Sequence, residues 1–363
     1  MVRTHWSIGT VAVLVSVLLV SGCPKSPKPT VVSQFKASLR LGEAPLTTKF
    51  RDLSDHDANA AAIDTWLWDF GDGTTSNEAA PTHTYTTPGA YLVKLTATSG
   101  SASTTTKLNN YIYVLDPNRT QGTTAGQQQT FAGIPFVWIP AGSFTLGIDQ
   151  KTENWSDADP AHPVNITYGF WMSQYEFTQA DYYDLTGDND STFRLPLQPS
   201  SDLPIETISW DEAQSLVARL NNENNVGLFR LPTEAEWEFA CRAGTTTDFY
   251  FGDDAFGTPG IADYGWTNEQ GLTSTELVGQ LLPNAWGLYD MHGNVWEWTQ
   301  DRYLPNYYAK SPKRNPMGPD FGTYRVARGG SWYTQPYSAA SVSRWGFLPN
   351  SELPIVGVRL VLQ

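Results

Sequence analysis

The sequence has few residues of the kinds that carry metal or redox chemistry. Among 363 residues it contains two cysteines, Cys23 and Cys241, and five histidines. So few thiols exclude a framework of several disulfides. No two histidines beyond His5 have the close spacing of a zinc-binding pair. The sequence also shows no Ser-His-Asp set, glycine-rich phosphate loop or paired catalytic carboxylates.

The sequence also has few positively charged residues. Lys and Arg total 23 against 37 Asp and Glu, which gives a formal net charge of −14. Binding to nucleic acid or anionic lipid usually requires a basic face, which this balance disfavours. We therefore predict no nucleic-acid partner.

The apolar run at residues 8–20 is too short for a membrane span and has the length of a signal-peptide core. It ends in VSGC at residues 20–23, which resembles the bacterial lipobox, whose cysteine becomes the lipid-modified first residue. The resemblance implies a signal peptide at residues 1–22 and lipidation of Cys23. Cys23 would begin a Pro-rich tether that runs to residue 32. The implied location is the bacterial cell envelope, on the outer membrane or cell surface. An ordinary cleaved signal with an incidental cysteine is the alternative.

Residues 33–115 form an all-β pattern, with alternating apolar residues at 91–97 and glycine-rich turns. The runs WDFGDG (68–73), THTY (82–85) and PGAY (88–91) together resemble the polycystic-kidney-disease (PKD) repeat, which implies an immunoglobulin-like sandwich. Asp69 and Asp72 are either metal ligands or turn-forming side chains, and the turn role is favoured.

Residues 116–130 are almost free of apolar side chains and predict a linker before a last domain at 131–363. That domain should open with a hairpin at 136–147. Three capping boxes, beginning at Thr178, Ser209 and Thr233, predict short helices. Glu212 and Glu236 are better explained as members of these caps than as catalytic acids.

Four blocks follow in order within the last domain, at residues 230–238 (RLPTEAEWE), 287–298 (GLYDMHGNVWEW), 328–332 (RGGSW) and 357–361 (GVRLV). Together they resemble the formylglycine-generating-enzyme (sulfatase-modifying-factor) superfamily. The resemblance implies an α+β, loop-rich variant of the C-type lectin fold. Members with oxidase activity use a cysteine pair soon after the third block. Here that stretch reads WYTQPYSAAS, so copper is not expected and the oxidase reaction is disfavoured.

The second block also suggests a cation. Carboxylates and carbonyls are the ligands that Ca²⁺ prefers. The resemblance places a structural calcium site on the side chains of Asp290 and Glu297 and the carbonyls of Gly293 and Val295. The alternative is a metal-free turn packed by tryptophans. His292, in the same block, is better explained as a packed residue than as a catalytic one, and Cys241 as a buried, inert thiol.

Residues 333–356 are rich in Tyr, Ser, Trp and Gly, which make adaptable binding surfaces. The arrangement resembles the variable proteins of diversity-generating retroelements, which carry a hypervariable patch near the C-terminus of this fold. The resemblance implies that eight residues contact an unknown protein or glycan ligand: Tyr333, Thr334, Tyr337, Ser338, Ser341, Ser343, Trp345 and Phe347. The alternative is that several of them pack the last strands.

Three functions remain open. The preferred one is a lipid-anchored surface protein that binds a ligand through its last domain, with the PKD-like domain as a stalk. The second is an oxidoreductase of the formylglycine-generating type. The third is a structural or assembly lipoprotein of the cell envelope.

Overall fold

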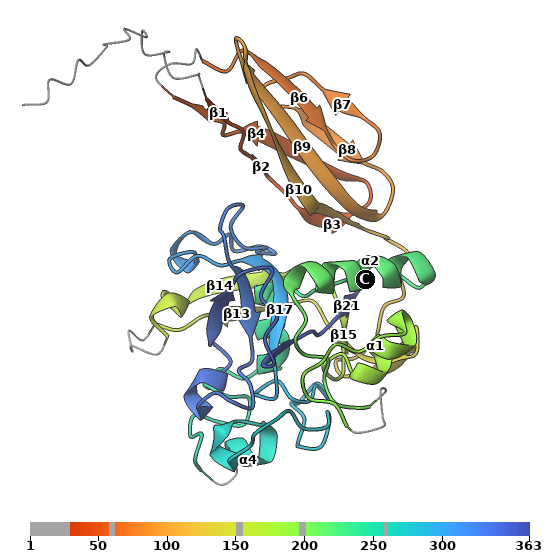
Figure 1. Ribbon diagram of the computed structural model, residues 1–363, viewed down its shortest axis with the longest axis vertical. Coiled ribbons are helices and arrows are strands. Elements are labelled where there is room, and N and C mark those ends of the chain that lie inside the picture. Colours follow the sequence, from red (N-terminus) through yellow and green to blue (C-terminus); the bar gives the residue numbers. More distant parts are fainter. Residues whose placement is uncertain (1–29, 58–61, 150–154, 196–200, 258–259) are drawn as a thin grey trace, which may run out of the picture.

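The computed structural model describes residues 30–57, 62–149, 155–195, 201–257 and 260–363. Cys23 and most of the predicted tether lie outside these ranges. Two domains follow one another, an N-terminal β-sandwich and a larger C-terminal domain of short strands, helices and long loops (Figure 1). This is the fold class that the sequence predicted. Within the described ranges, no helix has the length and apolar composition needed to cross a bilayer.

The N-terminal domain packs a three-stranded sheet, in the order β2-β4-β8, against a five-stranded sheet, in the order β3-β10-β9-β6-β7, and β1 pairs separately with β5. Its core is aromatic, with Trp68 fully buried and in contact with Phe35 and Phe50. The strands are β1 (Val31–Val32), β2 (Phe35–Ala37), β3 (Leu41–Glu43), β4 (Leu46–Asp52), β5 (Asp55–His56), β6 (Thr65–Asp69), β7 (Thr75–Ser76), β8 (Thr82–Tyr85), β9 (Gly89–Ser99) and β10 (Ala102–Leu115).

The turn between β6 and β7 settles the role of its two aspartates. Asp69 accepts a hydrogen bond from the amide of Gly71 and pairs with Lys94 at 2.7 Å. Asp72 accepts from the amide and hydroxyl of Thr74 and lies 2.7 Å from His83 Nε2. Both carboxylates therefore shape the turn and its surroundings, as predicted.

The C-terminal domain has a five-stranded sheet, β11-β12-β15-β21-β16, a four-stranded sheet, β19-β18-β17-β20, and a β13-β14 pair. The strands are β11 (Gln128–Phe131), β12 (Ile134–Ile139), β13 (Gly142–Leu146), β14 (His162–Ile166), β15 (Phe170–Ser173), β16 (Phe229–Arg230), β17 (Trp296–Arg302), β18 (Arg325–Arg328), β19 (Arg344–Phe347), β20 (Val356–Gly357) and β21 (Val361–Leu362).

The helices of this domain begin where the capping boxes predicted. Thr178, Ser209 and Thr233 each accept from the amide three residues on, while the acid at that position bonds back to the cap. Such reciprocal bonds satisfy two free amides at each helix start. The helices are α1 (Gln179–Thr186), α2 (Trp210–Glu223), α3 (Glu234–Arg242) and α4 (Ile261–Tyr264), with single 3₁₀ turns η1 (Ser156–Ala158), η2 (Asn268–Gln270), η3 (Tyr308–Lys310) and η4 (Pro336–Ala339).

The predicted hairpin at 136–147 does not form. β12 pairs with β11 and β15, whereas β13 pairs with β14 in another sheet. Five of the six β12 residues are buried, while β13 alternates between exposed and covered positions. A strand covered on both faces needs a neighbour on each edge, and the sheet interior supplies both.

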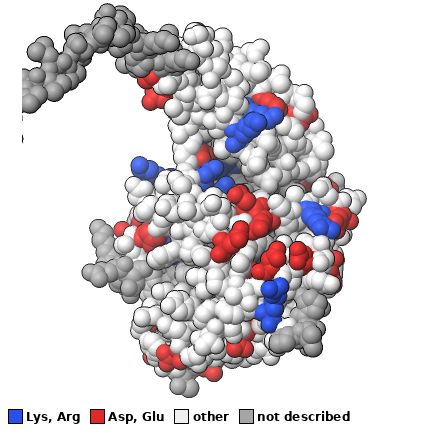
Figure 2. Space-filling model, in the orientation of Figure 1, with Lys and Arg blue, Asp and Glu red and all other residues white. Residues whose placement is uncertain are grey.

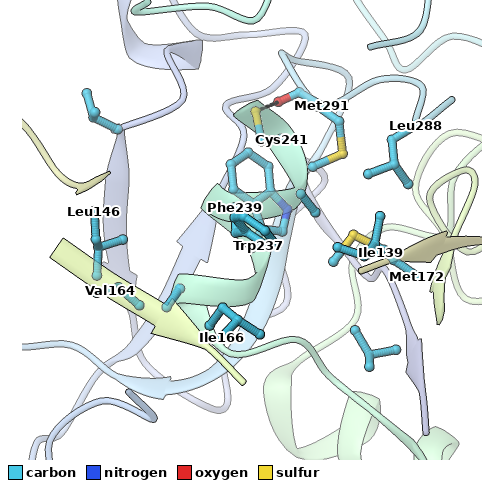
Figure 3. Close-up of a cluster of buried hydrophobic side chains, with 14 of the residues drawn as sticks. Ile139, Leu146, Val164, Ile166, Met172, Trp237, Phe239, Cys241, Leu288 and Met291 are labelled. Atoms are coloured by element: carbon cyan, nitrogen blue, oxygen red, sulfur yellow. Dashed lines mark hydrogen bonds between the residues drawn. The ribbon is translucent and has the colours of Figure 1, made fainter. Parts of the chain in front are cut away.

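The main core surrounds α3. Trp237, Phe239 and Cys241 of this helix pack with side chains of β12, β14 and the loop before β17 (Figure 3). The Cys241 thiol lies 3.9 Å from the carbonyl oxygen of Met291. All nine residues of α3 are buried, including its three glutamates.

The two domains share this core. Leu41, Tyr113 and Leu115 of the N-terminal sandwich are buried in the same cluster as the α3 side chains. The guanidinium of Arg230 lies over the Tyr113 ring at 5.9 Å. α2 lies directly beneath the sandwich in Figure 1, and its Gln214 accepts a hydrogen bond from Asn110. The N-terminal domain is therefore packed onto its neighbour, rather than held away from it as a stalk.

The segment predicted as a linker contributes to this packing. Thr120 accepts a hydrogen bond from the indole of Trp171, and residues 128–131 form β11. Arg119 is buried and pairs with Glu43 of the sandwich at 2.8 Å. The C-terminal domain thus begins near residue 120, before the predicted boundary at 131, because polar residues with paired backbone groups can be ordered without apolar side chains.

Candidate functional site

The sequence blocks that stand out in the last domain meet as buried ion pairs. Arg230 and Glu236, both within the first block, pair at 2.6 Å. Glu238 of the first block accepts from Arg328 of the third. Glu297 of the second block pairs with Arg359 of the fourth at 2.8 Å. Burying a charge is costly unless it is paired and hydrogen-bonded, so these residues maintain the fold and are not free for chemistry.

The arrangement explains the ionisation of Glu236. Burial alone would raise the pKa of this carboxyl, but the Arg230 guanidinium lowers it below its ordinary value. Tyr168 and the Thr233 amide add hydrogen bonds to the same carboxylate. Glu236 is therefore a charged cap and ion-pair partner, as the capping pattern predicted.

The two carboxylates of the predicted calcium site are both buried, and the charge of Glu297 contributes to raising the pKa of Asp290. Both oxygens of Glu297 accept from Arg359, and the Trp237 indole donates to the same carboxylate at 2.6 Å. One oxygen of Asp290 accepts from the Gly279 amide at 2.7 Å. Across the described ranges, no group of three or more His, Cys, Asp or Glu side chains is placed to hold a metal ion. The predicted set has only two such side chains, Asp290 and Glu297, together with the Gly293 and Val295 carbonyls, so calcium at this place stays a prediction.

Asp290 lies near a second buried acid, Glu176, which sequence reasoning missed. The second oxygen of Asp290 has no hydrogen-bond partner, and burial raises its pKa to about 6. Glu176, which no motif marked, accepts from the Asn294 side chain and the Val295 amide. Burial, reinforced by the charges of Asp290 and Glu297, raises the pKa of Glu176 well above its ordinary value.

The predicted contact residues after the third block divide into two groups. Tyr333, Tyr337, Ser338 and Trp345 are exposed, with 68% of Tyr333 and 56% of Trp345 accessible to solvent, and Thr334 is half-buried. These five lie on a segment, residues 333–347, that we call the C-terminal surface segment. Phe256, which carries no sequence signal, is also exposed and contacts Tyr337 edge to face at 5.6 Å.

Three predicted contact residues have structural roles. Ser341 and Ser343 are buried. The Ser343 hydroxyl accepts from the Trp155 indole at 3.0 Å. Phe347 packs against Trp296 and Trp298 in the second hydrophobic cluster. For these three, the alternative of packing the last strands is correct.

Arg328 holds the backbone of the C-terminal surface segment through hydrogen bonds. Its guanidinium is fully buried and donates to the carbonyls of Ser341, Val342 and Ser343 at 2.7–2.9 Å. Glu238 fixes the same guanidinium from α3. Because these hydrogen bonds already hold its backbone, the segment loses little conformational entropy when its exposed side chains bind a ligand.

A cavity adjoins the start of the segment. It has a volume of about 460 Å³ and is lined by residues 192–195, Leu203 and residues 274–277. The Phe193 ring in its wall contacts the Trp332 ring at 5.4 Å, and Trp332 contacts Tyr333 at 5.5 Å. Tyr333 therefore stands close to a hollow of a size that accepts a small ligand.

The order of the four blocks and the sheets that they join agree with a family model. The model described as "Sulfatase-modifying factor enzyme 1-like domain" matches residues 120–363, and the PKD domain model matches residues 27–114. The chain belongs to the sulfatase-modifying factor enzyme 1-like family. The PKD prediction is confirmed as well.

Relatives and solved structures agree. The formylglycine-generating enzyme of Streptomyces coelicolor is 41% identical over 175 residues, a match that covers 43% of this chain and 51% of that enzyme. This chain thus spans about half the length of that relative. PvdO from Pseudomonas aeruginosa has a TM-score of 0.59 at 26% identity, covering 67% of this chain and all of PvdO. Treponema denticola variable protein 1 has a TM-score of 0.54 at 24% identity, covering 65% and 98%, which shows a shared C-type-lectin-like fold.

The sulfatase-modifying-factor-like domain has one cysteine among its described residues, Cys241, and burial raises its pKa to about 12. At neutral pH this thiol is not a thiolate, the reactive form. His292, its neighbour, donates from Nδ1 to the Ala339 carbonyl and accepts at Nε2 from the Tyr250 amide. Burial lowers the pKa of His292 to about 3. Both are packed residues, as predicted.

Proposed function

We propose that this protein binds a ligand through the C-terminal surface segment and is not a formylglycine-generating oxidase. The observation that carries the proposal is the exposure of Tyr333, Tyr337 and Trp345 on a backbone that Arg328 holds by three hydrogen bonds. Large aromatic side chains lose little conformational entropy on binding and bury much area. Leaving them in water is otherwise unfavourable, so an exposed group of them supports a contact role.

The ligand is a protein or glycan outside the cell, and the anchor is a lipid on Cys23. The neighbour named variable protein 1 shares the fold and supports the further proposal that residues 333–356 are diversified. Substitutions confined to these codons, found by sequencing the gene in a population of source cells, would support diversification. A uniform sequence would contradict diversification and leave a receptor for one fixed ligand.

Binding itself is tested with arrays of envelope glycans and surface proteins. The protein and three variants are compared: Tyr333→Ala, Trp345→Ala and, as a matched control, Tyr324→Ala, which removes an exposed tyrosine outside the segment. We expect the wild type and the control to bind one ligand equally. Tyr333→Ala and Trp345→Ala should bind the same ligand roughly tenfold or more weakly. Equal binding by all four proteins would contradict the proposed surface.

An oxidoreductase of the formylglycine-generating type is the second candidate, favoured by the 41% identity to the Streptomyces coelicolor enzyme. The sequence after Ser331 contains no cysteine, and Cys241 is buried. The test is oxygen consumption with a Cys-containing peptide and Cu(I). Turnover that Cys241→Ser abolishes would establish this function and overturn the proposal above.

A further inference from the structure

The junction between the two domains contains a cavity that concentrates positive charge. Its volume is about 170 Å³, and both domains line it. Its charged lining residues are four cations and two acids: Arg40, Lys107, Arg302, Arg325, Asp211 and Asp320. The whole chain has a net charge of −14, so a local excess of two positive charges runs against its composition. Lys and Arg side chains are visible at the waist between the domains in Figure 2.

One of the four cations has a carboxylate partner. Arg40 lies 3.6 Å from Asp320 and donates to the carbonyls of Met317 and Gly318. Asp320 also accepts from the Tyr111 hydroxyl at 2.8 Å. This ion pair closes one wall of the cavity with residues from both domains, and its charges offset each other.

Arg302 and Arg325 have no carboxylate bonded to them among the described residues. Each donates to one backbone carbonyl, Arg302 to Gly322 and Arg325 to Gln300. The Arg325 guanidinium also lies over the Trp210 ring at 3.5 Å, which fixes its plane. In the part of the chain that the structure describes, these two guanidiniums donate no other hydrogen bond.

The two guanidiniums also repel each other. Burial and the charge of Arg302 together lower the pKa of Arg325 to about 9. Burial and the charge of Arg40 lower the pKa of Arg302. Asp211, in the first turn of α2, and Asp301 are the acids whose charges oppose this effect at Arg325. Partly buried cations without partners are unfavourable unless a counter-charge completes the site.

We propose that this cavity binds a small oxyanion, a carboxylate, sulfate or phosphate group, between Arg302, Arg325 and Lys107. Guanidinium groups hold such oxyanions by paired, charge-assisted hydrogen bonds. The N-terminal end of α2, at Trp210, lies in the same wall and adds a favourable dipole. Because both domains line the cavity, the bound anion stabilises the domain junction. The site is separate from the C-terminal surface segment, so either proposal can fail alone.

The experiment measures binding of glucuronate, sulfate and phosphate to the full chain by titration calorimetry, at constant ionic strength in chloride. We expect saturable binding of at least one anion at roughly millimolar concentration or tighter. The anion bound most tightly identifies the ligand class. The absence of saturable binding by all three would overturn the proposal.

Two variants locate the site. Arg302→Gln removes one guanidinium from the cavity, and Arg219→Gln removes an arginine of an exposed α2 pair outside it. We expect Arg302→Gln to weaken anion binding roughly tenfold or more, with Arg219→Gln equal to wild type. We also expect Arg302→Gln to melt no lower than wild type without anion, because repulsion is removed. Equal anion affinity in the two variants would show a general salt effect and overturn the site.

Discussion

The carboxylate of Glu297 and the guanidinium of Arg359 form a fully buried pair, with Arg359 Nε 2.8 and 2.9 Å from the two Glu297 oxygens. The pair joins the second and fourth sequence blocks. Arg359 also donates to the carbonyls of Ser173, Gln174 and Tyr289, so one guanidinium ties two further chain segments to Glu297. The main role of the blocks that identify the family is thus to hold loops together.

Glu297→Gln should lower the free energy of unfolding by about 3–5 kcal/mol, because Arg359 is left buried without its counter-charge. Urea unfolding in calcium and in chelator also tests the predicted calcium site, because an equal loss in both conditions would remove it. Glu223→Gln, in the exposed pair with Arg219, is the control and should cost at most about 0.5 kcal/mol. A larger loss in calcium than in chelator would support Glu297 as a metal ligand.

The buried Asp290 should make the protein more stable in mild acid. Its pKa is near 3.8 when unfolded and about 6 when folded. The folded state therefore binds the extra proton between these values, and stability rises as pH falls through 6 toward 4. The contribution is at most about 3 kcal/mol.

Asp290→Asn should remove this contribution. The check is the difference in unfolding free energy between wild type and variant from pH 7 to pH 4, with the exposed Asp202→Asn as control. A difference that does not change with pH would show that Asp290 does not titrate in this range. Comparing the two proteins cancels the buried Asp301, which titrates in both, whereas loss of the Asp290 charge also lowers the pKa of Glu176.

The shared core predicts that the two domains unfold together. Calorimetry of the full chain should give one transition, because Leu41, Tyr113 and Leu115 lie in the core that surrounds α3. Tyr113→Ala should lower stability by about 3–5 kcal/mol. Tyr113→Phe should be neutral or stabilising by about 1 kcal/mol, because the buried hydroxyl has no hydrogen-bond partner. Two separate transitions would mean that the domains are independent.

The exposed aromatic residues should matter for binding and not for folding. Tyr333→Ala and Trp345→Ala should change the unfolding free energy by no more than about 0.5 kcal/mol. Trp298→Ala, which empties a fully buried site, should cost about 3–5 kcal/mol in the same assay. A large loss for Tyr333→Ala or Trp345→Ala would show that the residue is part of the core.

Cys23→Ser should release the protein from membranes into the soluble fraction, as measured by fractionation and blotting. Several acyl chains hold a protein stably at a membrane, and their removal leaves an acidic domain with little attraction to anionic lipid. Cys241→Ser is the control and should stay at the membrane. Retention of Cys23→Ser would contradict lipidation.

Local patterns in the sequence predicted a good part of this molecule. The capping boxes at Thr178, Ser209 and Thr233 gave three helix starts, because a cap depends on residues three positions apart. The turn at Asp69 and Asp72 followed for the same reason. The features that the sequence patterns did not predict depend on contacts between residues far apart in the chain. One example is β12, which pairs with β15 instead of β13.

The features of the candidate site also fall into those that the sequence predicts and those that only the tertiary structure decides. Sequence alone determined the family, the absence of cysteine after Ser331 and the segment that carries the aromatic residues. Tertiary structure decided which side chains are available. It buried Ser341 and Ser343, occupied Glu297 with Arg359, and brought Arg302 and Arg325 to a cavity beside Arg40 and Lys107 of the other domain. Burial and charge pairing arise between residues up to hundreds of positions apart, so no local pattern contains them.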